Sequence, residues 1–163
     1  MNWNRITLGG GLIGAVVVAG AIIVYNWGAT PRLEGRITEV RTLGMDDRSS
    51  VAIINFEASN ASNYEISVTR REMAVVDENG TLLEGRILSV FDIQQLFNYF
   101  PALGGMKDEP LLDEQFLAPG ERVRGLSAAR FEIPKHELDV RQEIIFRTLD
   151  VKNRRTEIRM VSR

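Results

Sequence analysis

Two kinds of hydrophobic pattern divide the chain. Residues 6–31 run without an ionisable side chain, and a helix over Ile6–Asn26 would be about 31 Å long, close to the thickness of a bilayer's hydrocarbon core. Beyond this run, apolar residues alternate with polar ones or form short β-branched runs between turn residues, which is typical of strands. The pattern predicts a short head (1–5), a transmembrane helix (6–27), a linker (28–35) and a β-sandwich domain (36–163).

Aromatic residues mark both ends of the predicted span. Trp3 precedes it, and Tyr25 and Trp27 close it, as in the interfacial belt where amphipathic rings lie between headgroups and hydrocarbon. The competing interpretation is a cleaved signal peptide, with Arg5 as its positive region and residues 19–21 (Ala-Gly-Ala) as its cleavage site. The apolar region of a signal peptide is only about 7–15 residues long, so we expect a retained signal-anchor.

The orientation of the anchor rests on two opposed arguments. Arg5 on the short side faces Arg32, Arg36 and Arg41 on the other side, so the positive-inside rule does not favour an outside domain. An N-terminal signal-anchor with a minimal head usually leaves the large domain on the far side of the membrane. We therefore expect a single-pass membrane protein with its C-terminal domain extracytoplasmic.

Small residues form two rows on the predicted span. Gly10 and Gly14 make one row, and Gly11, Ala15 and Ala19 make a second row on the neighbouring face. Such residues let two helix backbones approach each other in lipid, which predicts a helix-packing face and a homodimer through the span. The alternative is that these residues only reflect the high frequency of Gly and Ala in membrane spans.

The rest of the chain predicts an antiparallel sandwich of the immunoglobulin or fibronectin type. Turn residues bound the strands, notably over 44–50, 58–63, Asp77–Gly80 and Leu117–Glu121. Phe131 should face inward just before Pro134, and Gly125 predicts a β-bulge. The predicted strands cover residues 36–43, 51–57, 64–69, 73–76, 81–88, 122–133, 142–151 and 155–161.

One helix interrupts the strands, over Ser89–Phe100. Ser89 is its predicted N-cap, Asp92 completes a capping box and Pro101 ends it. Its apolar residues share one face, but Phe91 and Tyr99 project from the polar side. Either the helix caps an open end of the sandwich and residues 101–112 cover these rings, or the rings form a partner-binding patch.

Composition excludes several classes of function. Arg5 is the only basic residue among the first 31, so the domain carries 19 Lys and Arg against 22 Asp and Glu. This balance gives no electrostatic reason to expect nucleic acid as a partner. Cysteine is absent, which excludes disulfides and thiolate chemistry.

The inventory of reactive side chains predicts neither catalytic nor cofactor-binding residues. His136 is the sole histidine and has no cysteine partner. The acidic pairs Asp46–Asp47, Asp108–Glu109 and Asp113–Glu114 lack the spacing of a calcium loop and lie in expected solvated loops. We therefore expect no metal site.

Several loop segments carry a resemblance. Residues 55–62 (NFEASNAS), the hairpin at Asp77–Gly80, Leu117–Glu121 and the segment Phe131–Pro134 together resemble membrane-anchored sandwich domains related to fibronectin type III and to the late-embryogenesis-abundant type 2 (water-stress) fold. The chain also resembles uncharacterised single-pass bacterial membrane proteins. The resemblance implies the sandwich fold, and it transfers no catalytic residue.

These observations predict a membrane-tethered, non-catalytic binding or assembly module of the cell envelope. Its partners would be the membrane itself and an envelope protein, and Phe91 and Tyr99 are the candidate contact residues. Two alternatives stay open. One is a stress-protective domain that acts through general surface properties, and the other is an enzyme with carboxylates in a cleft near the helix.

Overall fold

The main sheet of the domain is antiparallel at every strand pair. The computed structural model describes residues 33–151 and 153–162, and the main sheet has the strand order β1-β2-β7-β5-β4-β8-β9, with β3 and β6 forming a separate pair. The prediction of a mainly β domain is confirmed. The elements are β1 (Leu33–Asp46), β2 (Ser49–Asn60), β3 (Ile66–Val68), β4 (Arg70–Val76), β5 (Leu82–Ile87), α2 (Val90–Tyr99), η1 (Pro101–Leu103), β6 (Gln115–Leu117), β7 (Arg122–Phe131), α3 (Lys135–Asp139), β8 (Glu143–Leu149) and β9 (Arg155–Val161).

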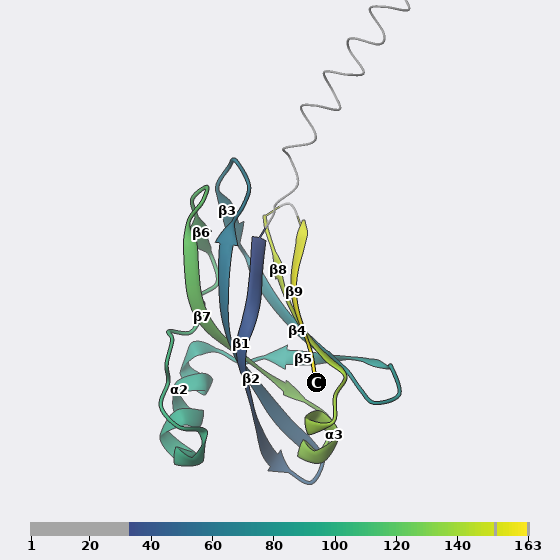
Figure 1. Cartoon of the computed structure of the whole chain (residues 1–163). Coiled ribbons are helices and arrows are strands. Elements are labelled where there is room, and N and C mark those ends of the chain that lie inside the picture. The colour runs from purple at the N-terminus through teal and green to yellow at the C-terminus, as the bar shows by residue number, and fades with distance from the viewer. Residues whose placement is uncertain (1–32, 152, 163) are drawn as a thin grey trace, which may run out of the picture. The chain divides into compact units, whose positions relative to one another are not determined.

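This single sheet folds over into two layers (Figure 1). The sheet bends between β7 and β5, which pair only at Arg130 and Ala129 of β7. Phe56 of β2 and Phe146 of β8 meet across the interior, with ring centroids 4.8 Å apart. One layer is therefore β1-β2-β7, the other is β5-β4-β8-β9, and an apolar core fills the space between them.

Strand β2 is buried on both faces. Ile54 and Phe56 point into the core between the layers, whereas Val51 and Ile53 point outward into a second apolar cluster with Ile93 of α2. Each of these side chains is at most 1% exposed. Helix α2 therefore covers the outer face of the β1-β2-β7 layer (Figure 1), and the expectation that it caps an open end of the sandwich is wrong.

The outer face of the second layer carries ion pairs instead. The guanidinium of Arg147 on β8 donates to Glu84 of β5 at 2.7 Å and to Glu157 of β9 at 2.9 Å. The hydrogen bond from Arg159, joined by that from Arg147, lowers the pKa of the Glu157 carboxyl from its ordinary value. Since charged side chains cover this face, only the first layer takes a helical cover.

Two local predictions need correction. The expected loop over 44–50 is a tight turn, because β1 runs to Asp46 and β2 begins at Ser49. The expected bulge at Gly125 is absent, since the register of β2 with β7 continues through that residue, and the irregularities lie in β1. Gly125 instead makes room for an aromatic ring, because a Cβ there would lie 2.9 Å from Cζ of Phe56.

The predicted anchor falls outside the described residues. This applies to the head, the span over 6–27 and its candidate packing residues Gly10, Gly11, Gly14, Ala15 and Ala19. In the part of the chain that the structure does describe, no helix has the length and apolarity to cross a membrane. The predicted linker is shorter than expected at its far end, because β1 already begins at Leu33.

A second glycine and aromatic pair yields a stability prediction. Phe131 is 1% exposed, as expected from its position before Pro134, and a Cβ at Gly85 would lie 2.6 Å from its Cζ. Gly85→Ala should therefore lower the free energy of unfolding by about 1–3 kcal/mol through overpacking. Combining it with Phe131→Leu, which shortens the opposing side chain, should cost less than the two single changes added together, by about 0.5–3 kcal/mol. Urea melts of the three variants measure this coupling, and simple additivity would contradict the contact.

Candidate functional site

Helix α2 forms where the sequence predicts it. The side-chain hydroxyl of Ser89 accepts a hydrogen bond from the backbone N–H of Asp92 at 3.1 Å, and the Asp92 carboxylate accepts one from the backbone N–H of Ser89 at 3.3 Å. This capping box satisfies two donors that the first turn leaves unpaired. Pro101 follows the helix and opens η1, so the expected end of the helix is confirmed as well.

Arg41 of β1 ties the segment after α2 to the sheet. Its guanidinium donates to the carbonyl of Leu103 at 2.8 Å and to the side-chain oxygen of Asn55 at 2.8 Å, and it lies 5.0 Å from the ring centroid of Phe97. Asn55, only 2% exposed, donates in turn to the Asp108 carboxylate at 2.6 Å. These polar contacts fix the C-terminal end of α2 and the segment after it on the outer face of β1 and β2.

The candidate contact residues Phe91 and Tyr99 are both exposed. Their exposed fractions are 66% and 74%, so the expectation that residues 101–112 cover the two rings is wrong. The reason is the Arg41 contact, which holds the chain after the helix on β2 rather than over the rings. Eight residues of helix place the two side chains about 80° apart around the axis, so they do not form one stacked pair.

Tyr99 borders a hollow of about 310 Å³ on one flank of α2, which we call the Tyr99 hollow. Met45 of β1, Arg86 of β5 and Arg130 of β7 also line it. Arg130 donates to the hydroxyl of Ser49 at 3.0 Å, and no ion pair of Arg86 occurs within residues 33–151 and 153–162. The hollow therefore joins an aromatic ring, a flexible apolar side chain and two guanidinium groups.

Acidic residues lie at the rim of this hollow. Asp46 is 3.8 Å from the guanidinium of Arg130, and Ser49 donates to its carboxylate at 2.8 Å. The Ser49 hydrogen bond, together with the Arg48 amide and the charge of Arg130, lowers the pKa of the Asp46 carboxyl. Asp46 is therefore ionised at neutral pH. Asp92 also lines the hollow, and Glu132 lies 3.9 Å from the guanidinium of Arg130, so acidic groups offset the positive charge there.

A larger hollow of about 760 Å³ lies on the other flank of α2, and we call it the edge groove. Val90 and Gln94 of α2 form one wall. The chain from Met106 to Leu112 forms another, and Gln115 of β6 and Val123 and Arg124 of β7 complete it. The groove is thus bounded by the helix, the segment that follows it and one side of a strand.

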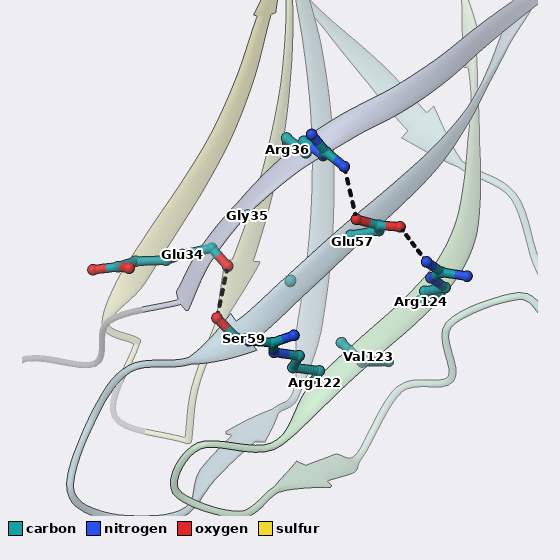
Figure 2. Close-up of a pocket in the computed structure, with 9 residues that line it drawn as sticks. Glu34, Gly35, Arg36, Glu57, Ser59, Arg122, Val123 and Arg124 are labelled. Carbon is teal, nitrogen blue, oxygen red and sulfur yellow. Dashed lines mark hydrogen bonds and ion pairs between the residues drawn. The ribbon is translucent and has the colours of Figure 1, made fainter.

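A charged trough of about 400 Å³ on the outer face of the β1-β2-β7 layer shares Val123 and Arg124 with the edge groove. In Figure 2, the Glu57 carboxylate of β2 lies between the guanidinium groups of Arg36 and Arg124, at 3.2 and 2.8 Å. Arg122 lies beside them on β7 (Figure 2). Two of the three guanidinium groups along the trough therefore share one carboxylate, and Glu34 lines the same trough.

Three of the six acidic residues considered as cation ligands, Asp46, Asp108 and Asp113, accept hydrogen bonds from other side chains of the domain. Asp108 accepts from Asn55, and Asp113 accepts from Arg71 of β4 at 2.8 Å. Among residues 33–151 and 153–162, no cluster of three or more histidine or acidic side chains has a geometry suited to a metal ion. The side chain of His136 lies on α3 with 81% of its surface exposed.

Sequence reasoning missed most of the residues around Tyr99. Met45, Arg86 and Arg130 come from three strands that are far apart in the chain, and no local pattern brings them together. Arg122 and Arg124 were open to prediction, because residues two apart in a strand share one face. Their pairing with Glu57, by contrast, depends on the register of β2 with β7.

Comparison with known proteins yields distant structural likeness only. No family model and no curated protein sequence matches the chain. A lipoprotein candidate from Bacillus subtilis, ycdA, shares 10% identity over 81% of this chain, with a TM-score of 0.43. The match spans only 38% of the length of that protein. A β-sandwich protein from Clostridium difficile shares 9% identity over 79% of this chain and 85% of its own, with a TM-score of 0.39. The predicted relationship to fibronectin type III or water-stress domains is not shown, and likeness at this level does not extend to function.

The contacts of Arg41 generate a second prediction. Arg41→Leu leaves the carbonyls of Leu103 and Gly105 and the amide of Asn55 without their donor, so it should lower the free energy of unfolding by about 2–4 kcal/mol. Amide exchange in α2 should also become faster. Arg36→Leu is the matched control, since that side chain is 76% exposed in its ion pair and should change stability by less than about 1 kcal/mol. Equal effects of the two changes would show that Arg41 does not hold the insertion.

Proposed function

We propose that this chain is a membrane-tethered, non-catalytic β-sandwich module of the cell envelope that binds a protein partner through the exposed side of α2 and the Tyr99 hollow. The observation that carries the proposal is the contrast on α2. The helix is fixed to the sheet by a buried apolar face and by Arg41, yet it exposes two large aromatic rings. Exposure of the two rings contributes nothing to the folding of the domain. Each ring would bury apolar surface if a partner bound over it.

The side chains around Tyr99 suit a protein interface. Tyrosine, methionine and arginine are enriched in interfaces, and hot spots are richest in tryptophan, tyrosine and arginine. Tyr99, Met45, Arg86 and Arg130 bring these types together over one hollow. Because strands and a capped helix hold their backbones, binding would cost side-chain but not backbone conformational entropy.

The tether is supported by the sequence of the first 31 residues. Their apolar run is long enough to span a bilayer, and β1 begins at Leu33. Residues 28–32 then reach at most about 18 Å. A domain on so short a linker would stay beside the membrane, where an envelope protein anchored in the same bilayer is a natural partner. We further propose that the domain is extracytoplasmic and of immunoglobulin or fibronectin type, which its two antiparallel layers support.

A third prediction concerns the tether. The full-length chain should sediment with membranes, remain there in high salt and enter solution only with detergent, because a spanning helix is held by hydrocarbon rather than by charge. A chain that begins at residue 32 should stay in solution. Protease added to intact spheroplasts should digest the domain if it is extracytoplasmic. Recovery from cells of a protein whose first residue is near Ile22 would contradict the anchor.

A fourth prediction separates binding from folding at α2. The double change Phe91→Ala and Tyr99→Ala should alter the free energy of unfolding by less than about 1 kcal/mol, because both rings are exposed. It should nevertheless weaken binding of the partner by about 30-fold or more, as expected for hot-spot residues. The measurement is cross-linked recovery of the partner from membranes, quantified against the unfolding midpoint.

Phe116→Ala is the matched control for this experiment. Phe116 lies on β6, is 59% exposed and does not line the Tyr99 hollow. Its loss should leave partner recovery unchanged. Equal recovery by the double variant and by Phe116→Ala would place the binding surface elsewhere.

A further inference from the structure

Strand β7 is paired along only part of one side. Its pairing with β2 is continuous, from Arg122 opposite Ser59 to Phe131 opposite Ser50. On its other side, β5 pairs only with Ala129 and Arg130. Among the described strands, the first residues of β7 therefore have a neighbour on one side only and form an unpaired edge. This edge lies in the middle of the strand order, whose outermost strands are β1 and β9.

The backbone groups at this edge point into the edge groove. Leu126 donates its N–H to the carbonyl of Glu109 at 2.9 Å, and its own carbonyl accepts from the N–H of Leu111 at 2.9 Å, both on the side away from β2. Residues two apart in a strand point their backbone groups to the same side. The N–H and C=O of Arg124 and Arg122 therefore also point away from β2, and no strand of the described chain pairs with them there.

We propose that this edge binds an extended segment of a partner polypeptide as an added strand, in which apolar and acidic side chains alternate. This proposal rests on the proposed function, because it assumes that the ligand is a protein. The site is a different one, on the flank of α2 opposite the Tyr99 hollow. Backbone hydrogen bonds to Arg122 and Arg124 would supply affinity, and alternate side chains would supply specificity.

The apolar half of the alternation follows from the apolar residues that line the groove. Val123 packs against the core between the layers and also lines the groove. Met106 and Leu112 line the same groove and are 39% and 57% exposed. Apolar side chains of an added strand that point into the groove would contact these three residues and remove their apolar surface from water.

The acidic half follows from the outward face. Arg122 and Arg124 both project outward, and the nearby Glu57 carboxylate is shared by Arg124 and Arg36. Carboxylates at the outward positions of an added strand would lie opposite these guanidinium groups, where cross-strand pairs of opposite charge stabilise a sheet. The row of arginines thus favours an acidic strand.

The same charges disfavour a second copy of this chain as the occupant. Two β7 edges that paired with each other would bring arginines opposite arginines, and like charges directly opposite are destabilising. Charged residues on an edge are a known protection against such self-pairing. Pairing of this edge with a second copy of itself is therefore disfavoured, and pairing with an acidic segment is favoured.

The test uses the full-length chain in detergent micelles and a blocked heptapeptide in which glutamate and valine alternate, with glutamate at both ends. This peptide should bind, as followed by fluorescence anisotropy of a labelled form. The alternating lysine and valine peptide should bind at least about tenfold more weakly, and so should a peptide with the same glutamates and valines in two blocks. Equal binding of all three peptides would overturn the proposal.

Two variants separate backbone pairing from charge. Arg124→Ala removes the guanidinium alone, whereas Arg124→Pro also removes the N–H that points into the groove. Since that N–H has no strand partner, proline is tolerated there, and an unchanged unfolding midpoint would verify this. Arg124→Pro should weaken peptide binding by about a further tenfold relative to Arg124→Ala, as loss of a backbone hydrogen bond predicts. Equal affinities of the two variants would contradict strand addition.

Amide exchange gives a readout that needs no variant. In the free protein, the amides of Val123 and Gly125 should exchange slowly because they face β2, and those of Arg122 and Arg124 should exchange fast. The alternating peptide should slow only the second pair. Slow exchange of all four amides before peptide is added, or a dimer in sedimentation that the peptide does not dissociate, would overturn the proposal.

These outcomes remain distinguishable from failure of the proposed function. The Phe91→Ala and Tyr99→Ala double variant should bind the peptide with unchanged affinity, because neither residue lines the edge groove. Loss of partner binding in that variant with peptide binding intact supports both sites. Peptide binding that disappears in the double variant would assign the peptide to α2 and would overturn strand addition at β7.

Discussion

Burial of β2 on both of its faces is the constraint on which the rest of the domain depends. A strand whose inward residues fill the core and whose outward residues are equally apolar needs cover on each side. The second layer supplies one cover, and α2 with the segment after it supplies the other. The helix is therefore part of the packing of the sheet rather than a decoration at its end.

This constraint also determines what the surface offers. Once α2 lies across the outer face of β2, its own outer side is held in place, and Phe91 and Tyr99 stay exposed. The segment that returns from α2 runs beside β7 only as far as Leu126. Arg122 and Arg124, which precede Leu126 in β7, therefore keep backbone groups that no described strand pairs with. The position of α2 and of the segment after it thus accounts for both the Tyr99 hollow and the edge groove.

The local elements of the fold were predictable, and their assembly was not. Alternation located the strands, and the pair Ser89 and Asp92 located the start of α2, because both depend on neighbours in the chain. The role of Gly125 depends on a ring from β2 that lies opposite it. Arg41 looked like any polar residue of a strand, and only the return of the chain over it gave it its three acceptors.

The central claim is that α2 and β2 form one cooperative unit, and native-state hydrogen exchange tests it most directly. If the claim holds, the most protected amides of α2, such as that of Leu96, exchange with the same opening free energy and the same denaturant dependence as those of Ile53 and Ile54. If α2 is an appendage, its amides exchange through a local opening several kcal/mol cheaper, while β2 keeps full protection. That second result would contradict the account of the fold and of the surface that α2 presents.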